Sequence, residues 1–241
     1  MKLSVIIPAY NEERRLPKTL KSVDEYLKRQ DYQYEIIVVN DGSKDKTAEI
    51  VENLKSQIAN LKLIDRKENR GKGYSVKEGM LNAQGEYRIF MDADNSTSID
   101  QIEKMWPWFE KGFDIVIGSR DIKGAVLDPP QPFIRRFVGE VFKFIRMLIC
   151  DLYTLHDTQC GFKCFTKRSA EAIFPKTRIE RFAFDVEILL IAKKLGFKIK
   201  EIPVYWKNDL ESKVKLKSAL KMGLDLFKIR WYQLKGLYGK K

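Results

Sequence analysis

Apolar runs alternate with stretches of helical periodicity along the first half of the chain. Five runs rich in Val, Ile and Leu are expected to be strands, at 2–8, 34–41, 61–65, 86–92 and 113–119. Four segments between them have the apolar spacing of amphipathic helices, at 12–29, 44–57, 73–83 and 99–110. This alternation predicts an α/β fold in which a mostly parallel sheet carries helices on both faces, as in Rossmann-like, doubly wound domains.

Polar segments follow the first four predicted strands, at the ends where such sheets bind ligands. They are PAYNEE, NDGSKDKT, NRGKG and DADNST, in chain order. Each segment taken alone is also compatible with an ordinary turn or helix cap. Because the carboxyl ends of parallel strands meet at one edge of a sheet, we expect the four segments to form one site.

Asp92 and Asp94 stand one residue apart in the last of these segments. Two neighbouring carboxylates repel each other unless they are solvated or share a hard cation, and Mg²⁺ binds through one or two carboxylates together with substrate phosphates. A solvated turn is the alternative, because D-x-D is common by chance. Neither a G-x-G-x-x-G nor a G-x-x-x-x-G-K-[ST] motif is present, which disfavours a dinucleotide dehydrogenase and a P-loop NTPase. A nucleotide site remains, in which Asp41 accepts from a base or ribose and a metal bridges the diphosphate.

The composition fits one large α/β domain, with 241 residues and 44% hydrophobic content. No run reaches the roughly 18 uncharged apolar residues that span a bilayer, and the first apolar run is too short for a secretory signal. We therefore expect a cytoplasmic protein without an integral anchor. Cys150, Cys160 and Cys164 lack zinc-type spacing and are predicted to be reduced, buried thiols.

The net positive charge is confined to the second half of the chain. Residues 1–120 carry 20 Lys and Arg against 20 Asp and Glu, whereas residues 121–241 carry 25 against 13. This asymmetry indicates that the second half faces an anionic partner, such as nucleic acid or a membrane surface.

Two segments in the basic half have the spacing of amphipathic helices. Residues 134–149 place eight apolar side chains at helical spacing, with Arg136, Lys143 and Arg146 on the other side. Residues 213–235 interleave lysines with apolar residues in the same way. Such helices lie in bilayer interfaces, although a helix packed on the core with a solvated basic face is the commoner case. Together with the charge asymmetry, the pattern favours peripheral membrane association.

The motifs resemble those of a known family. VIIPAYNEE, IIVVNDGSKDKT, NRGKG and MDADNST are similar to successive motifs of the family 2 inverting glycosyltransferases, which have the GT-A fold. The second half is similar to the dolichyl-phosphate β-glucosyltransferases of that family, through GSRD (118–121), DTQCGFKCFTK (157–167), 181–206 and 221–230. The resemblance implies a GT-A catalytic domain over 1–211, including an acceptor- and membrane-facing helix at 131–150. A C-terminal basic amphipathic helix follows over 212–241.

The resemblance also implies roles at the donor site. The positions that hold the nucleoside are matched by Pro8, Tyr10, Asn11, Glu12 and Asp41. Lys72 matches a position that lies close to the nucleotide in this family, and Ala93 belongs to the motif that binds the nucleotide sugar. Asp92 and Asp94 match the metal pair for Mg²⁺ or Mn²⁺, with Asp94 the stronger candidate for direct coordination. The family's usual residues after D-x-D are replaced here by Asn95 and Ser96, so a third ligand stays open.

The catalytic set implied by the resemblance comprises Asp94, Arg120, Asp157, Gln159 and Lys163. Arg120 matches a position near the acceptor phosphate, and Arg135 or Arg136 is expected to share that role. For Asp157, proton acceptance and orientation of the acceptor both stay open, and Gln159 and Lys163 are expected to contact phosphates or sugar. A structural turn is the alternative for this segment.

Three further residues are interpreted without the resemblance. His156 is the only histidine, and we interpret it as structural or exposed. Asp185 and Glu187 open a predicted helix, where a role as helix caps and a substrate role remain equally open.

The expected reaction is transfer of a hexose from a nucleotide sugar to a polyprenyl or dolichyl phosphate, with inversion. UDP-glucose is the favoured donor, ahead of GDP-mannose and UDP-N-acetylglucosamine. A transferase acting on a hydroxyl group is one alternative, and it needs a catalytic base, for which Asp157 is the candidate. A basic nucleic-acid-binding protein is the other, but no recognition motif is present. Relatives generally carry an N-terminal membrane segment that this sequence lacks, so we expect recruitment to the cytoplasmic membrane face by the basic helices or by a membrane-protein partner.

Overall fold

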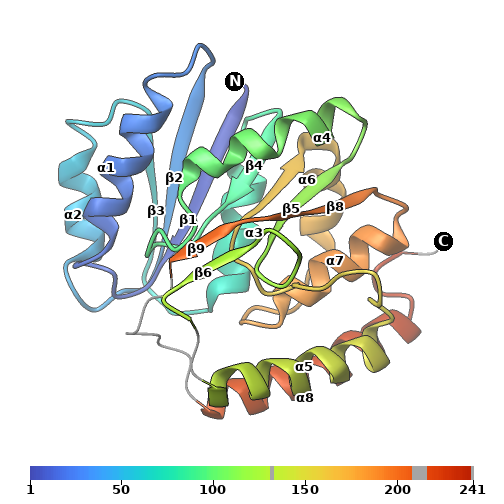
Figure 1. The fold of residues 1–241 in the computed structure, drawn as a ribbon. Coiled ribbons are helices and arrows are strands. Elements are labelled where there is room, and N and C mark those ends of the chain that lie inside the picture. Colours follow the sequence, from blue (N-terminus) through green and yellow to red (C-terminus); the bar gives the residue numbers. More distant parts are fainter. Residues whose placement is uncertain (131–132, 208–215, 240–241) are drawn as a thin grey trace.

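A seven-stranded sheet forms the centre of the molecule, with the strand order β3-β2-β1-β4-β7-β5-β8 (Figure 1). The computed structural model describes residues 1–130, 133–207 and 216–239, with the side chains of 133–138 and 216–220 excepted. The strands are β1 (Leu3–Ala9), β2 (Tyr34–Asp41), β3 (Leu61–Arg66), β4 (Tyr87–Phe90), β5 (Ile115–Ser119), β7 (Lys163–Thr166) and β8 (Ile199–Pro203). Only β7 runs antiparallel to its neighbours among these seven strands, so the predicted mostly parallel sheet is confirmed.

Helices cover both faces of this sheet, as predicted. The alternation of side chains along β1 shows the division, since Val5 and Ile7 pack in one core cluster and Ile6 packs in the other. The first cluster includes residues of α1 (Leu16–Leu27), α2 (Thr47–Leu54), η1 (Ile99–Lys104) and α4 (Trp106–Glu110). The second includes residues of α3 (Lys72–Asn82), α6 (Lys167–Ile173), η2 (Phe174–Lys176) and α7 (Phe184–Lys194).

The single helix expected at 99–110 is two elements. A 3₁₀ helix ends at Lys104, and a short α-helix begins at Trp106. Pro107 lies in the first turn of that second helix. Proline has no N–H to donate and is tolerated only at a helix start, which explains why the segment restarts there.

The direction of strand β7 determines which segments of the two halves of the chain lie together at one end of the strands. It is antiparallel to β4 on one side and to β5 on the other, so β5 points in the same direction as β1 to β4. The residues after β5 and the residues before β7 therefore meet the polar segments that follow β1 to β4. A parallel ribbon of β6 (Val126–Asp128) and β9 (Tyr205–Lys207) lies outside the sheet (Figure 1).

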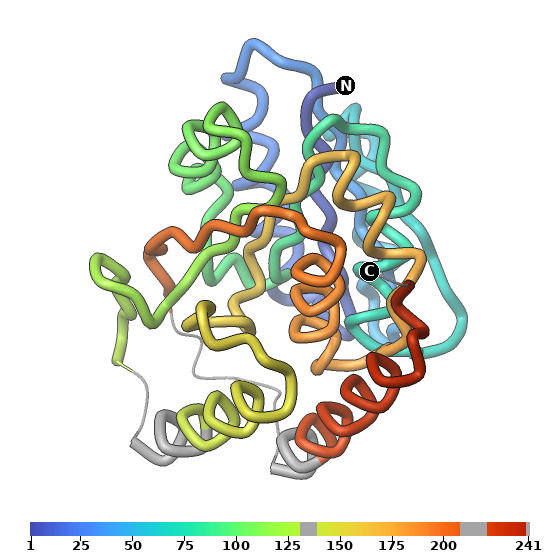
Figure 2. The backbone as a smooth tube through the Cα atoms, turned by 90° about the vertical axis from the view of Figure 1, so that its right-hand side faces the viewer, coloured from blue at the N-terminus to red at the C-terminus, as the bar shows by residue number. Residues whose placement is uncertain are grey.

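Two long helices, α5 (Phe133–Cys150) and α8 (Leu216–Leu234), lie side by side below the sheet (Figures 1 and 2). Leu226 and Ile229 of α8 join the core cluster that includes α7. Within the described residues, no helix is long and apolar enough to cross a membrane. The predicted domain boundary at 211–212 lies outside the described residues.

Arg146 of α5 corrects one expectation. The periodicity placed it on a solvated basic side, but its side chain is 1% exposed. Its guanidinium donates to the carbonyl oxygens of Leu155, at 2.9 Å, and Leu152, at 3.4 Å. These carbonyls compensate for the lost hydration, and Arg146 ties the helix to the loop that follows it.

Candidate active site

The segments after β1 and β2 are joined by hydrogen bonds. The backbone N–H of Asn11 donates to Ser43 Oγ at 2.9 Å, and the Asn11 side-chain oxygen accepts from the N–H of Lys44 at 2.9 Å. The N–H of Glu12 donates to Thr47 Oγ1 at 2.8 Å. Asn11 has a positive φ of 53°, which asparagine tolerates better than most residues. The predicted nucleoside-binding segments are therefore built as one unit.

Pro8 and Tyr10 border this unit. Pro8 lies within β1, in register with Val39 of β2, while Tyr10 follows the strand and is 37% exposed. The Glu12 carboxylate accepts from Arg15 Nε at 2.7 Å and from Nη2 at 2.6 Å. Arg15 was not identified from the sequence, where its spacing of three from Glu12 was the available signal.

The Asp41 carboxylate connects β2 to the NRGKG segment. It accepts from the backbone N–H groups of Arg70 and Gly71, both at 2.8 Å, and forms an ion pair with Arg66. Asp41 is 3% exposed, so these donors compensate for its burial. Gly71 has a φ of 112°, where a side chain would be strained. The loop is therefore fixed by Asp41 from one side.

Lys72 and Asp92 form an ion pair in the site. Lys72 begins α3, and its ammonium contacts Asp92 Oδ1. Burial acts to lower the pKa of Lys72, but the carboxylates of Asp92 and Asp185 outweigh it and raise that pKa above its ordinary value. On its other side Asp92 lies against the backbone of Gly161, where an added Cβ would be 2.5 Å from Asp92 Cγ.

Asp94 has a polar and a cationic neighbour. Its carboxylate accepts from the N–H of Ser96 at 3.0 Å and lies 4.0 Å from Arg15 Nη1. Burial, and then the charge of Asp92, raise its pKa above the ordinary value. The Asn95 Oδ1 atom next to it is buried and accepts no hydrogen bond from the described residues. The turn thus gathers the Asp92 and Asp94 carboxylates and this amide oxygen.

Ala93 holds this turn against α1. Its carbonyl oxygen accepts from Thr19 Oγ1 at 2.7 Å, and the residue is 7% exposed.

In the part of the chain that the structure describes, no group of three or more His, Cys, Asp or Glu side chains is placed to hold a metal ion.

Arg120 and Asp157 form a two-point ion pair after β5. Arg120 Nε lies 2.6 Å from Asp157 Oδ2, and Nη2 lies 2.9 Å from Oδ1. The backbone N–H groups of Arg120, Gln159 and Cys160 also donate to the carboxylate. Although burial opposes it, the guanidinium holds the pKa of Asp157 well below its usual range. The Arg120 guanidinium also lies 4.7 Å from the ring of Trp206, a residue that sequence reasoning did not single out.

Lys163 is placed in the core of the sheet. It is 0% exposed, and its ammonium donates to the carbonyl of Cys160 and to Asp185. In this geometry the protein itself satisfies the ammonium, and its contact with a substrate stays a prediction. Gln159 Nε2 is buried and has no hydrogen-bond partner among the described residues, and its contact with a substrate also stays a prediction.

The remaining sequence predictions concern two arginines, the histidine and the three cysteines. The side chains of Arg135 and Arg136 lie outside the described residues. His156 is largely exposed and its Nδ1 lies 3.0 Å from Glu201 Oε2, which agrees with a surface position. The three cysteines are free and buried, as predicted.

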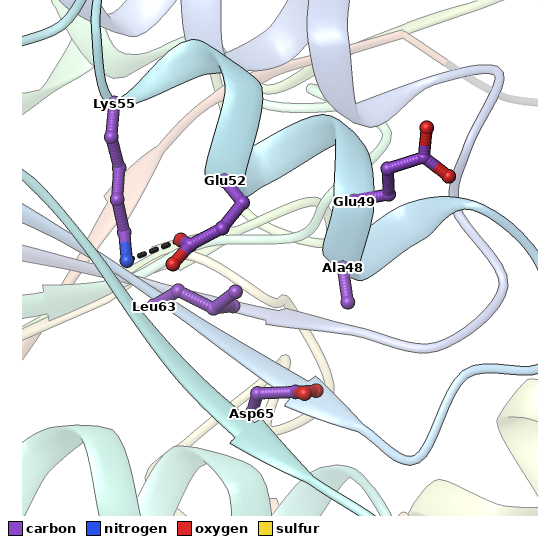
Figure 3. A pocket seen from close by; sticks show the side chains of 6 residues that line it. All are labelled: Ala48, Glu49, Glu52, Lys55, Leu63 and Asp65. Atoms are coloured by element: carbon purple, nitrogen blue, oxygen red, sulfur yellow. Dashed lines mark ion pairs between the residues drawn. The ribbon is translucent and has the colours of Figure 1, made fainter.

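A shallow pocket lies elsewhere, on the face of the sheet that α2 covers (Figure 3). It is lined by Ala48, Glu49, Glu52, Lys55, Leu63 and Asp65. Lys55 is paired with Glu52, so the remaining charges are carboxylates and repel an anionic ligand. Arg66, the next residue after Asp65, points to the other face and pairs with Asp41. The chemistry of the site lies there, and not in this pocket.

Residues 4–174 match the model described as "Glycosyl transferase family 2". The chain belongs to glycosyl transferase family 2. This family 2 transferase is 38% identical over 246 residues to a dolichyl-phosphate beta-glucosyltransferase of Trichomonas vaginalis, covering 98% of this chain and 75% of that protein. It is 35% identical to the Homo sapiens protein of the same name, over 98% of this chain and 77% of that protein.

Solved structures agree on the fold. Glucosyl-3-phosphoglycerate synthase from Mycobacterium tuberculosis, in complex with UDP, superposes with a TM-score of 0.69 at 16% identity, covering 100% of this chain and 81% of that one. TarS of S. aureus superposes with a TM-score of 0.60 at 19% identity, covering 98% and 73%. At these identities the likeness establishes the fold of the family 2 transferase, which is GT-A, and no more.

Proposed function

We propose that this glycosyltransferase transfers glucose from UDP-glucose to a polyprenyl or dolichyl phosphate with inversion at the anomeric carbon. The names of the similar dolichyl-phosphate beta-glucosyltransferases support this substrate pair. The observation that carries it in the structure is the buried Arg120–Asp157 pair, which fixes a guanidinium at the same sheet edge as Asp92 and Asp94. Such a group suits an anionic acceptor brought to a nucleotide-sugar site.

Asp92 and Asp94 fit a divalent cation, Mg²⁺ or Mn²⁺, on three grounds. Both are carboxylates, the pKa of Asp94 is raised by burial and then by the charge of Asp92, which a cation would offset, and Asn95 Oδ1 is a buried oxygen with no donor among the described residues. A glucosyl-3-phosphoglycerate synthase of the same fold has been solved with Mn²⁺ and UDP. When bound, the cation supplies positive charge that stabilises the leaving nucleoside diphosphate.

The protein's own residues bind and orient the donor. We assign the nucleoside to the unit formed by the segments after β1 and β2, which holds Asn11 and Glu12, together with Pro8, Tyr10 and Asp41 beside it. Lys72 stands at the N-terminus of α3, where the helix dipole favours an anion. Its ammonium is assigned to the donor phosphates, beside Asp92. The unsatisfied Gln159 amide is assigned to a sugar hydroxyl.

The acceptor needs no catalytic base in this scheme. A phosphate monoester is already anionic near neutral pH, so positioning and charge neutralisation dominate. Asp157 accepts five hydrogen-bond contacts, including the backbone N–H of Arg120, and its lowered pKa makes it a poor proton acceptor. We propose that Asp157 positions Arg120, which receives the acceptor phosphate. This arrangement disfavours a hydroxyl acceptor, and direct displacement converts an α-linked donor into a β-linked product.

The α5 and α8 helices are proposed to seat the enzyme on the cytoplasmic face of a membrane. Each helix has an apolar side beyond the one that packs on the core. We call this the apolar patch, and its residues are between 53% and 71% exposed: Phe144, Leu148, Leu224, Phe227, Trp231 and Leu234. Exposed Lys and Arg side chains border it on α8, such as Lys221 and Arg230. Apolar side chains flanked by basic ones suit an anionic bilayer surface. Membrane binding through this patch does not require a membrane-protein partner.

A donor panel tests the proposed function. The purified protein is incubated with Mg²⁺ or Mn²⁺, a short-chain polyprenyl phosphate, and UDP-glucose, GDP-mannose or UDP-N-acetylglucosamine in parallel. Release of nucleoside diphosphate and formation of glycolipid are both followed. We expect glycolipid from UDP-glucose alone. Glycolipid from a different donor would replace the sugar assignment, and nucleotide release only with hydroxyl acceptors would overturn the lipid phosphate as acceptor.

A further inference from the structure

Tyr238 is buried although it follows the exposed end of α8. It is 0% exposed, whereas Leu234 and Leu237 just before it are both exposed. Its hydroxyl donates to Glu187 Oε1 at 2.7 Å. Burial and the carboxylate raise the pKa of Tyr238, so the phenol remains a donor. A buried hydrogen bond therefore connects the residues after α8 to Glu187, 51 positions earlier in the chain.

Glu187 passes this constraint to the segment before α7. It lies in the first turn of that helix and is 0% exposed. Its carboxylate accepts from the N–H of Arg178 at 2.9 Å and from that of Ile179 at 2.9 Å. Removal of the Tyr238 hydroxyl would leave this buried carboxylate with the backbone donors alone.

Residues 177–181 in turn contact the start of α3, and we call them the supporting loop. The carbonyl of Glu180 accepts from the N–H of Tyr74 at 3.0 Å, and the carbonyl of Thr177 accepts from Lys77 Nζ at 2.8 Å. The loop lies so close to Gly73 that an added Cβ would be 2.6 Å from the carbonyl oxygen of Ile179. Lys72, whose ammonium contacts Asp92, is the neighbour of Gly73.

We propose that Tyr238 is a positioning residue for the donor-diphosphate site, acting through Glu187 and the supporting loop on Lys72. The inference rests on the proposed function for the identity of the donor. It has a clear alternative, in which Tyr238 only fills the core with its ring. A phenylalanine would fill the core equally well but cannot hold Glu187, so the hydroxyl separates the two roles.

The test compares Tyr238→Phe with the matched control Tyr232→Phe. Tyr232 lies in α8, with its ring 6.2 Å from that of Tyr238 and 5.8 Å from Arg178 Cζ. Phenylalanine keeps this ring, and among the described residues the Tyr232 hydroxyl makes no hydrogen bond to Glu187. Binding of UDP with Mg²⁺ is measured by calorimetry without lipid, and kcat and KM for UDP-glucose are measured with acceptor. Loss of one buried hydrogen bond corresponds to about a three- to tenfold effect. For Tyr238→Phe we expect the Kd for UDP and the KM for UDP-glucose to rise by this factor, with kcat changed less than twofold. The control should show no change.

Hydrogen exchange at the Tyr74 amide provides a readout that needs no nucleotide. We expect faster exchange there in Tyr238→Phe than in wild type or Tyr232→Phe. An unchanged Kd together with unchanged exchange would overturn the positioning role, even if the melting temperature falls. If wild type binds no UDP, the donor assignment fails, and the exchange result alone decides on Tyr238. Should Tyr238→Phe not fold, Glu187→Gln, which keeps an oxygen for the backbone donors, is expected to give the same pattern in weaker form.

Discussion

Gly161 leaves no room for a side chain beside Asp92. An added Cβ would lie 2.5 Å from Asp92 Cγ and 2.7 Å from Oδ1, so the glycine backbone determines where that carboxylate stands. The opposite side of Asp92 is held by Lys72. The D-x-D turn is thereby positioned by two segments that are remote from it in sequence.

Gly161→Ala is therefore expected to reduce turnover at least tenfold by displacing Asp92. The enzyme should remain folded, because the overlap falls on a partly exposed side chain. Gly139→Ala is the matched control, since an added Cβ there meets nothing within 4 Å and the activity should not change. Kinetics with UDP-glucose and a thermal melt check both variants. Wild-type turnover in Gly161→Ala would show that Asp92 need not be held in this place.

Asp94→Asn is expected to abolish metal-dependent turnover while the fold stays intact. The pKa of Asp94 is raised by burial and by Asp92, so its charge destabilises the folded protein above that pKa, and the amide removes this cost. Without added metal, the melting temperature of the variant should equal or exceed that of wild type near neutral pH. The difference should vanish as the pH falls through the raised pKa and wild-type Asp94 becomes protonated. Full activity of the variant would remove the proposed metal role.

The strands and the convergence of polar segments could be predicted from the sequence for physical reasons. Continuous Val and Ile runs are buried on both faces of the sheet, and β2 occupies the predicted residues 34–41. Strand β7 could not be found in this way, because KCFT is only four residues long and follows a segment that resembles a turn. Its antiparallel direction, which brings Arg120 and Asp157 to the site, is a property of the whole sheet.

Periodicity also fails for the buried cation of α5. Arg146 was expected on a solvated face, but it is 1% exposed and donates to the carbonyl oxygen of Leu155. Lys163, whose contact with a substrate stays a prediction, is 0% exposed and donates to the carbonyl of Cys160 and to Asp185. Hydrophobic spacing predicts charged residues at exposed positions, because burial of an unpaired charge is costly. It does not reveal the hydrogen-bond partners that offset this cost, since those come from distant parts of the chain.

Phe227→Ser combined with Trp231→Ser tests the apolar patch. Both side chains are more than half exposed, so stability should change little. Two such side chains contribute about 2 kcal/mol on entering an apolar phase, so binding to anionic vesicles should fall at least tenfold. Leu81→Ser is the control, because Leu81 is 43% exposed on α3, outside the patch. Vesicle co-sedimentation measures the effect, and equal binding by both variants would place the membrane contact elsewhere.

Asp157→Asn is expected to lower the free energy of unfolding by about 3–5 kcal/mol at neutral pH, because it leaves Arg120 buried with a neutral partner. The pKa of Asp157 is depressed in the folded state, so its contribution is present above the ordinary carboxyl pKa and is lost as the pH falls toward the folded one. The stability difference between wild type and variant should therefore shrink below about pH 4. Urea unfolding at several pH values measures it. A difference that does not change with pH would mean that the carboxylate's charge is not what stabilises Arg120.

Arg120→Ala separates the acceptor from the donor. The guanidinium is assigned to the lipid phosphate, so its loss should raise KM for the polyprenyl phosphate by at least tenfold and KM for UDP-glucose by far less. Because this variant also leaves Asp157 buried without its ion-pair partner, Arg120→Lys is the matched variant. Lysine retains the charge but cannot form the two-point contact, so an intermediate KM for the acceptor is expected. Steady-state kinetics with each substrate varied in turn provide the measurement. A larger effect on the donor than on the acceptor would place Arg120 at the nucleotide diphosphate instead.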